Sequence, residues 1–465
     1  MPSRDEVFGN IDLNFDATVA KLLELIAIPS ISGDPSGEIG IGHAAEWLKQ
    51  ELDGIGLSAQ VIATKGHPVV LARSVPSSKS VRQRLLFYGH YDVQPVGDPD
   101  QWTHAPFDPC VIEEEGLHRI YGRGSSDSKS QLWTFIEALR AWSMVHGEFP
   151  ADIIVLLEGE EECGSPSLPD FIARYGSELA CDVAFICDAE MWSPTQPAIT
   201  TQLKGLVHER VTIFAPNPDM HSGHYGAVAA NPIRILSSIL AELHDEKGKV
   251  TIDGFYDGVP DIPKNIREQW IELAKERSLI GDVDLTGGVT EEGYSPLEAM
   301  WGRPTVDING IVGGNQGPGE RSVLPGSASA RLSFRLVAGQ EPEIIRQRFR
   351  SHVKARLPEG CRVEFEGSGG SAAVVLSQES KFLKASSRGL EEEWGRPAVL
   401  RATGGAIPLV EQFSRGLGAE CVVIGFILPG DAIHAPDERY DTERLRKGVR
   451  SWVRIFEQIR QGIEV

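Results

Sequence analysis

Residues 85–92 read LLFYGHYD, a short apolar run that ends in a histidine and an aspartate. Two further apolar runs, IIVLLE at 153–158 and VAFIC at 183–187, resemble it in length and composition. The segments between these runs, 131–145 and 168–175, space their apolar residues as helices do. Short buried strands that alternate with helices are typical of a mostly parallel sheet covered on both faces. The sequence therefore predicts a doubly wound α/β fold.

The pattern changes after about residue 201. Residues 207–215 and 329–337 alternate apolar with polar side chains, which indicates antiparallel strands with one solvated face. The first pattern returns after about residue 371. We therefore predict an α/β domain, residues 1–202 and 372–465, that is interrupted by an inserted α+β domain, residues 203–371.

The composition excludes several classes of protein. No apolar run in the 465 residues reaches the roughly 18 residues that a membrane helix needs. The net charge of -21 repels phosphate backbones and acidic lipid surfaces, so we expect no nucleic-acid or membrane partner. The six cysteines form no C-x-x-C pair, and the N-terminus lacks the features of a signal peptide. These features predict a cytoplasmic protein with reduced thiols.

Histidines and acidic residues follow four of the predicted strands. They are His90 and Asp92, Glu161 and Glu162, Asp188, and His434, while Asp127 stands just ahead of the predicted helix at 131–145. In a doubly wound sheet the carboxyl ends of the strands line one crevice, so these side chains are expected to converge. Imidazole and carboxylate without cysteine suit zinc, manganese or cobalt, and this many carboxylates suit a two-metal site.

An acidic run such as residues 158–162 is in most proteins a solvated surface. Here the run follows a strand too apolar to be exposed. Carboxylates at the mouth of a buried strand repel one another unless a cation or a proton neutralises them. We therefore expect a metal at this position. Single histidines elsewhere, such as His67 and His146, are interpreted as packed or surface residues.

Five motifs occur in a fixed order along the chain. They are GHYDVQP at 89–95, WTHAPF at 102–107, YGRGSSD at 121–127, EGEEECGS at 158–165 and DMHSGHYG at 219–226. Together they resemble the dinuclear-zinc metallopeptidase family of carnosine dipeptidase, aminoacylase and succinyl-diaminopimelate desuccinylase. The resemblance covers about residues 15–460, and the first motif and the length are most similar to the cytosolic dipeptidase branch.

The resemblance implies two divalent metal ions per chain, zinc first, with manganese and cobalt as alternatives. The implied ligands are His90, Asp127, Glu162, Asp188 and His434. Asp127 would bridge the two ions, and His434 would bind the ion that Glu162 holds. Asp92 would orient the imidazole of His90. Glu161 would be the general base on the water between the ions.

The resemblance also implies that the inserted domain is a lid and dimerisation domain. His221 would act in the neighbouring active site of a homodimer, where it would stabilise the oxyanion. Arg335 would bind the terminal carboxylate of the substrate. Ser322 and Gly405 would also contact the substrate. The implied activity is hydrolysis of the amide bond of dipeptides or short peptides with a free C-terminal carboxylate.

Some positions depart from the pattern of the family. Ser128 and Ser130 stand in a motif that usually reads Asp-Asp-Lys-Gly, and the family implies a cis peptide bond between Asp127 and Ser128. Ala406 replaces a serine that contacts substrate, and Asn315 stands where an aromatic residue is common. These departures bear on which peptide the pocket prefers. The alternative activity is that of an N-acyl or N-succinyl amino acid amidohydrolase, which shares the fold and the metals and differs only in the substrate pocket. A third hypothesis is a catalytically silent binding protein, which would need neither all five ligands nor the base.

Overall fold

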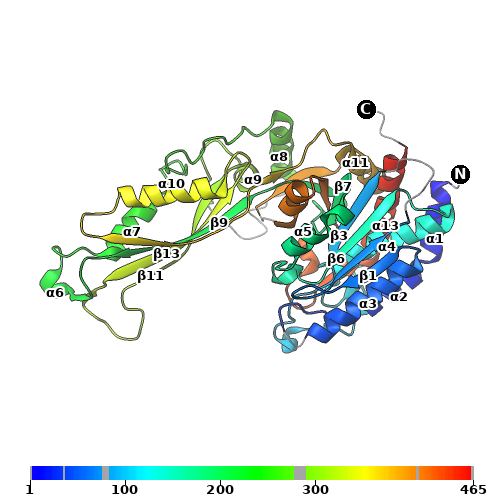
Figure 1. Ribbon diagram of the computed structural model, residues 1–465, viewed down its shortest axis with the longest axis horizontal. Helices are drawn as coiled ribbons and strands as arrows, with labels where there is room; N and C mark the ends of the chain where they lie inside the picture. Colours follow the sequence, from blue (N-terminus) through cyan, green and yellow to red (C-terminus); the bar gives the residue numbers. More distant parts are fainter. Residues whose placement is uncertain (1–2, 35–36, 76–82, 277–289, 405–407, 462–465) are drawn as a thin grey trace. The chain divides into compact units, whose positions relative to one another are not determined.

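The computed structural model describes residues 3–34, 37–75, 83–276, 290–404 and 408–461. The chain divides into two compact units. The first consists of Met1–Thr201, Leu376–Arg401 and Gln412–Val465, and the second of Gln202–Val375 and Ala402–Glu411. The chain therefore leaves the first unit twice: after Thr201, to form most of the second unit, and again after Arg401 for the short segment Ala402–Glu411. The colours of Figure 1 follow this course along the sequence.

A mixed sheet forms the centre of the first unit. Its strands lie in the order β1 (Ser58–Ile62), β2 (Val69–Arg73), β6 (Asp152–Glu158), β3 (Arg84–His90), β7 (Val183–Cys187), β17 (Glu420–Ile424) and β8 (Ala198–Leu203). The four strands β6, β3, β7 and β17 are parallel, whereas β1, β2 and β8 pair antiparallel beside them. The predicted α/β class is confirmed, and its parallel part is the middle of the sheet.

Helices cover both faces of this sheet. They are α1 (Arg4–Leu13), α2 (Phe15–Ile26), α3 (Glu38–Gly54), α4 (Lys129–His146), α5 (Leu168–Leu179), α11 (Lys381–Trp394) and α13 (Thr442–Arg460). Alternate residues of β3 point to opposite faces: Phe87 stacks on Phe135 of α4, while Tyr88 meets Phe413 edge to face. Burial on both faces explains why the central strands are apolar at nearly every position. No helix among the described residues is long and apolar enough to cross a membrane.

A small antiparallel sheet was not predicted from the sequence. It joins β4 (Cys110–Glu114) and β5 (Leu117–Tyr121) to β18 (Arg439–Asp441), near the end of the chain. The backbone N–H of Gly122 also donates to the carbonyl of Glu438 over 3.0 Å. This sheet fixes the loop that carries Asp127 to the segment that follows His434.

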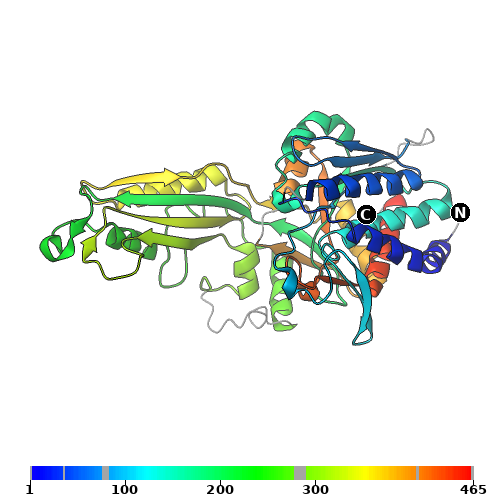
Figure 2. The same cartoon turned by 90° about the horizontal axis from the view of Figure 1, so that it is seen from below.

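The second unit is built on a four-stranded antiparallel sheet. Its order is β11 (Thr305–Gly313), β13 (Ser327–Leu336), β9 (Gly205–Phe214) and β14 (Arg362–Glu366). One face packs against α7 (Pro232–Ala241) and α10 (Pro342–Ala355), as Figure 2 shows. Buried and less buried residues alternate along β9, as the sequence predicts for 207–215. The remaining elements of this unit are β10 (Met220–His221), α6 (Ser222–Tyr225), α8 (Lys264–Glu276), α9 (Pro296–Gly302), β12 (Val323–Leu324) and α12 (Pro408–Glu411). Strands β15 (Val374–Val375) and β16 (Val399–Thr403) both pair with β8 and so extend the mixed sheet.

Candidate metal centre

Histidine and carboxylate side chains gather at the carboxyl ends of the parallel strands. The ligand atoms of His90, Asp127 and Asp188 lie within 4.8 Å of one another. Those of Asp127, Glu162 and His434 form a second such group. The five predicted ligands therefore lie together in the first unit, and Asp127 belongs to both groups.

The two carboxylate oxygens of Asp127 face different histidines. Oδ1 lies 3.2 Å from Nε2 of His90, and Oδ2 lies 2.9 Å from Nε2 of His434. His90 Nε2 is 3.8 Å from Asp188, and His434 Nε2 is 3.2 Å from Glu162. One carboxylate placed between two such groups can be shared by two cations. The peptide bond between Asp127 and Ser128 is cis, as expected from the resemblance.

The donor set fits a pair of divalent cations. Oε1 of Glu162 is buried and has no hydrogen-bond partner among the described residues. The side chains of Asp127, Glu162 and Asp188 are only 11%, 4% and 17% exposed, so water screens their mutual repulsion poorly. Imidazole nitrogens and carboxylate oxygens without a thiolate are ligands that zinc, manganese and cobalt accept.

The same crowding shifts the acidity of the site. Hydrogen bonds to Asp127 and Glu162 raise the pKa of His434 to about 10. Burial would raise the pKa of Asp127, but hydrogen bonds from His434 and His90 hold it below its usual value. Burial raises the pKa of Glu161 to about 8, and the neighbouring carboxylates add to this increase. At neutral pH and without a cation, His434 and Glu161 therefore carry protons.

Asp92 contacts both His90 and the turn after β6. Its Oδ1 lies 3.3 Å from Nδ1 of His90, and both side chains are fully buried. Its carboxylate also accepts the backbone N–H groups of Glu161 (3.3 Å) and Glu162 (3.0 Å). Asp92 can therefore orient the imidazole, as predicted, and it also fixes the turn that presents the candidate base.

The three acids after β6 have different surroundings. The carboxylate of Glu160 is buried and accepts the backbone N–H groups of His67 (2.7 Å) and Ser167 (3.0 Å). Glu160 therefore ties the turn to neighbouring loops. Glu161 and Glu162 begin the short 3-10 turn that follows, and the carboxylate of Glu162 enters the second ligand group.

Other residues around the centre were not predicted to take part. Nε2 of Gln94 donates to Oε2 of Glu162 over 2.9 Å and to its carbonyl over 3.1 Å. Gln94 lies within the motif GHYDVQP, which was the one signal available for it. Lys129 is fully buried, and its Nζ donates to the carbonyls of Leu25 in the last turn of α2 (3.0 Å) and of Ile28 just after it (2.7 Å).

The other predicted residues belong to the second unit or lie outside the described residues. His221 ends β10, is exposed and accepts the backbone N–H of Gly223 over 3.0 Å. Ser322 lies beside it, because its carbonyl accepts the N–H of Ser222 over 2.9 Å. Arg335 is half-buried in β13. Gly405 and Ala406 lie outside the described residues.

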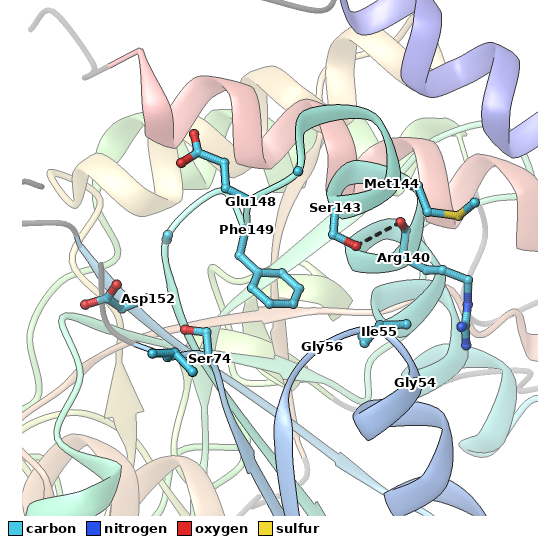
Figure 3. Close-up of a pocket in the computed structure, with 13 residues that line it drawn as sticks. Gly54, Ile55, Gly56, Ser74, Arg140, Ser143, Met144, Glu148, Phe149 and Asp152 are labelled. Carbon is cyan, nitrogen blue, oxygen red and sulfur yellow. Dashed lines mark hydrogen bonds between the residues drawn. The ribbon is translucent and has the colours of Figure 1, made fainter. Parts of the chain in front are cut away.

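A surface hollow of about 660 Å³ lies at the opposite end of β6 (Figure 3). Ser74, Met144, Phe149 and Asp152 are among its lining residues. β6 begins at Asp152 and ends beside the candidate ligands, so the hollow is at the amino end of the strand. Ligands of open α/β sheets bind at the carboxyl ends, and the hollow contains none of the predicted site residues.

The chain was also compared with known proteins. Residues 86–458 match peptidase family M20/M25/M40. The Cys-Gly metallodipeptidase of Schizosaccharomyces pombe is 25% identical over 96% of both chains, and the beta-Ala-His dipeptidase of Mus musculus is 26% identical over 97% of this chain and 94% of its own. The solved structure of an M20 family metallo-carboxypeptidase from Sulfolobus solfataricus has a TM-score of 0.78 and 29% identity, covering 96% of this chain and 99% of its own.

Proposed function

Because the chain belongs to peptidase family M20/M25/M40, we propose that it is a metal-dependent dipeptidase. It hydrolyses the amide bond of dipeptides or short peptides that have a free C-terminal carboxylate. The family resemblance drawn from the motifs is confirmed. The observation that carries the proposal is the pair of ligand groups that share Asp127. The names of the yeast and mouse relatives, both dipeptidases, support it.

Two divalent ions, zinc first, with manganese and cobalt as alternatives, would be held by the five ligands. His90 and Asp188 would hold one ion, Glu162 and His434 the other, and Asp127 both. When bound, such ions lower the pKa of a shared water and polarise the carbonyl of the scissile amide.

Glu161 is the proposed general base. It follows directly on Glu160 and precedes a ligand, and its backbone is held by Asp92. Its carboxylate takes a proton from the attacking water and returns it to the departing amine. The elevated pKa of about 8 shows how strongly this position favours a proton when no cation is present.

The inserted domain, predicted from the sequence at residues 203–371, is proposed to be a lid and dimerisation domain. His221 would serve the active site of the partner in a homodimer, and Arg335 would bind the substrate carboxylate. Strand β11 supports an interface of this kind, because it lies at the edge of its sheet, where another chain can pair with it. Two of its apolar residues are largely accessible to solvent, Ile311 at 51% and Val312 at 57%. The protein is proposed to be cytoplasmic, in keeping with six free cysteines.

A substrate panel tests the activity. The metal-loaded protein should hydrolyse dipeptides with a free C-terminus and should fail on the same dipeptides with an amidated C-terminus. N-acetyl and N-succinyl amino acids form the comparison set. Hydrolysis confined to these acylated substrates would instead establish the amidohydrolase, and a metal-loaded protein without activity on either set would establish a binding protein.

Replacing Glu161 tests the base. We expect Glu161→Gln to reduce turnover by about a hundredfold to ten-thousandfold, because it removes proton transfer in the transition state. Metal content, measured by atomic absorption, should stay near two ions per chain. A Glu161→Gln variant with turnover close to that of the wild type would exclude this residue as the base.

A further inference from the structure

We infer that Glu438 is a positioning residue of the metal centre, since its buried carboxylate holds the loop at residues 123–127 and thereby Asp127. This inference rests on the proposed function, because it concerns how the ligand shared by both groups is placed. Glu438 lies four residues after His434 and directly before β18. It is not a candidate ligand, and its side chain is fully buried.

Both carboxylate oxygens of Glu438 are surrounded by donors from this one loop. Oε1 accepts the backbone N–H groups of Ser126 (2.8 Å) and Asp127 (2.9 Å). Oε2 accepts the N–H of Gly124 (2.9 Å) and Nη1 of Arg123 (2.8 Å). Burial raises the pKa of Glu438 to about 7, but all four neighbouring groups are hydrogen-bond donors, which favour the ionised carboxylate. Four such hydrogen bonds, shielded from water, fix the course of the loop more tightly than bonds to a neutral group would.

An ion pair that serves only the stability of the fold would not need this arrangement. Arg123 supplies one of the four contacts, and three come from backbone amides of the loop. Buried ion pairs on average contribute little net stability. Buried amides without a partner are costly, however, so the carboxylate determines which loop conformation is possible.

A second buried carboxylate holds the same loop from the other side of His434. Oδ2 of Asp431 accepts hydrogen bonds from Oγ of Ser126 (2.6 Å) and from Nη1 of Arg444 (2.7 Å). The segment 428–438 therefore contacts the loop both before and after His434. The consequence is that His434 and Asp127, which are 307 residues apart in sequence, are set at 2.9 Å by contacts that involve no cation.

The experiment is the substitution Glu438→Gln. Glutamine has the same shape, but one of its two terminal atoms is an NH₂ group, which can only donate. Whichever oxygen of Glu438 this group replaces, it would face two other donors and could accept neither hydrogen bond. Loss of a residue that orients a metal ligand typically weakens metal binding by about 10-fold to 100-fold. We expect a loss of this size for both ions, because Asp127 belongs to both groups. Chelator competition titrations measure the affinities, and the visible absorption of the cobalt-loaded protein should change with the ligand geometry.

Glu209→Gln is the matched control. Glu209 is also buried and accepts Nη1 of Arg346 (2.9 Å) and Nε of Arg350 (2.8 Å), but it lies in the second unit, which holds none of the five ligands. Its substitution should lower the melting temperature and leave metal affinities and the cobalt spectrum unchanged. Equal losses of metal affinity in both variants would show a general effect of stability and overturn the inference.

Further outcomes separate the two proposals. A folded Glu438→Gln protein with affinities within twofold of the wild type overturns the role of Glu438 alone. If circular dichroism shows that this variant is unfolded, Glu438→Asp, which keeps the charge beside Arg123, is measured in its place. We then expect weaker binding of both ions as well, with a smaller loss of affinity. A wild-type protein that binds no pair of cations contradicts the proposed function itself.

Discussion

Each carboxylate oxygen of Asp127 contacts a histidine from a distant part of the chain, Oδ1 that of His90 and Oδ2 that of His434. The pKa of His434 is about 10 because Asp127 and Glu162 stabilise its charged form. Metals bind only the neutral imidazole, so cations and protons compete for the same nitrogen.

Metal loading should therefore release protons. At pH 7, below the pKa of His434, the metal-free protein carries the imidazolium, and the first effect of raising the pH toward 10 is tighter metal binding. Calorimetric titration with zinc in buffers of different ionisation enthalpy measures the number of protons released. His434→Ala should release fewer. Identical heats in all buffers would contradict the expected protonation.

Gln94 offers a second test at this scale. Gln94→Leu keeps the approximate size of the side chain but removes the N–H that contacts Glu162. We expect metal binding to weaken by about 10-fold, because an orienting hydrogen bond is lost. The activation curve with metal concentration should shift while activity at saturation largely returns. Gln101→Leu, at an exposed glutamine, is the control and should leave the curve in place.

Helices α11 and α13 pack closely against each other at a glycine, Gly389. A Cβ atom at Gly389 would lie 2.8 Å from Cγ1 of Ile455 and 2.9 Å from its backbone nitrogen. Because a backbone atom cannot yield as a side-chain tip can, Gly389→Ala should destabilise the protein by about 1–3 kcal/mol.

Denaturant unfolding of the metal-loaded protein measures this effect. The control is Gly42→Ala in α3, where nothing lies within 4 Å of the added Cβ. That substitution should be neutral or stabilise by up to about 1 kcal/mol, because alanine has the higher helix propensity. A similar loss in both variants would show that close packing at Gly389 is not the cause.

The elements also show what the sequence could predict. The strands β3, β6 and β7 were found because both faces are buried, which leaves an unbroken apolar run. α1 was not found, since it buries only Val7 and Ile11. The sheet of β4, β5 and β18 depends on a partner more than 300 residues away, which local periodicity cannot reveal.

The same limit applies to the metal centre. His90, Glu162 and Asp188 could be located because each follows a strand of recognisable composition. Glu438 could not, because its partners are backbone amides 311 to 314 residues earlier, and an amide has no sequence signature. The candidate ligands are thus visible in the sequence, whereas the residue proposed to position one of them becomes visible only in the fold.

At the scale of the whole molecule, the proposed exchange of His221 between partners has a direct test. Glu161→Gln and His221→Ala should each be inactive as homodimers. A heterodimer would combine Glu161 of one chain with His221 of the other in one of its two sites. Equal amounts, after unfolding and refolding together, should reach about a quarter of wild-type activity, because half of randomly formed dimers are mixed. A mixture with no more activity than its components would place His221 outside the partner's active site.

The order of the segments in the first unit has a consequence for how the protein is made. Its last candidate ligand, His434, and both carboxylates that fix the loop before Ser128 come from the final segment, Gln412–Val465. Ribosomes add about 5–20 residues per second, and the N-terminal part of the chain emerges first. In a nascent chain, His90, Asp127, Glu162 and Asp188 are therefore synthesised well before Asp431 and Glu438, the two carboxylates that hold the loop. The proposed cation site therefore cannot be completed before the segment Gln412–Val465 has been synthesised and has emerged from the ribosome.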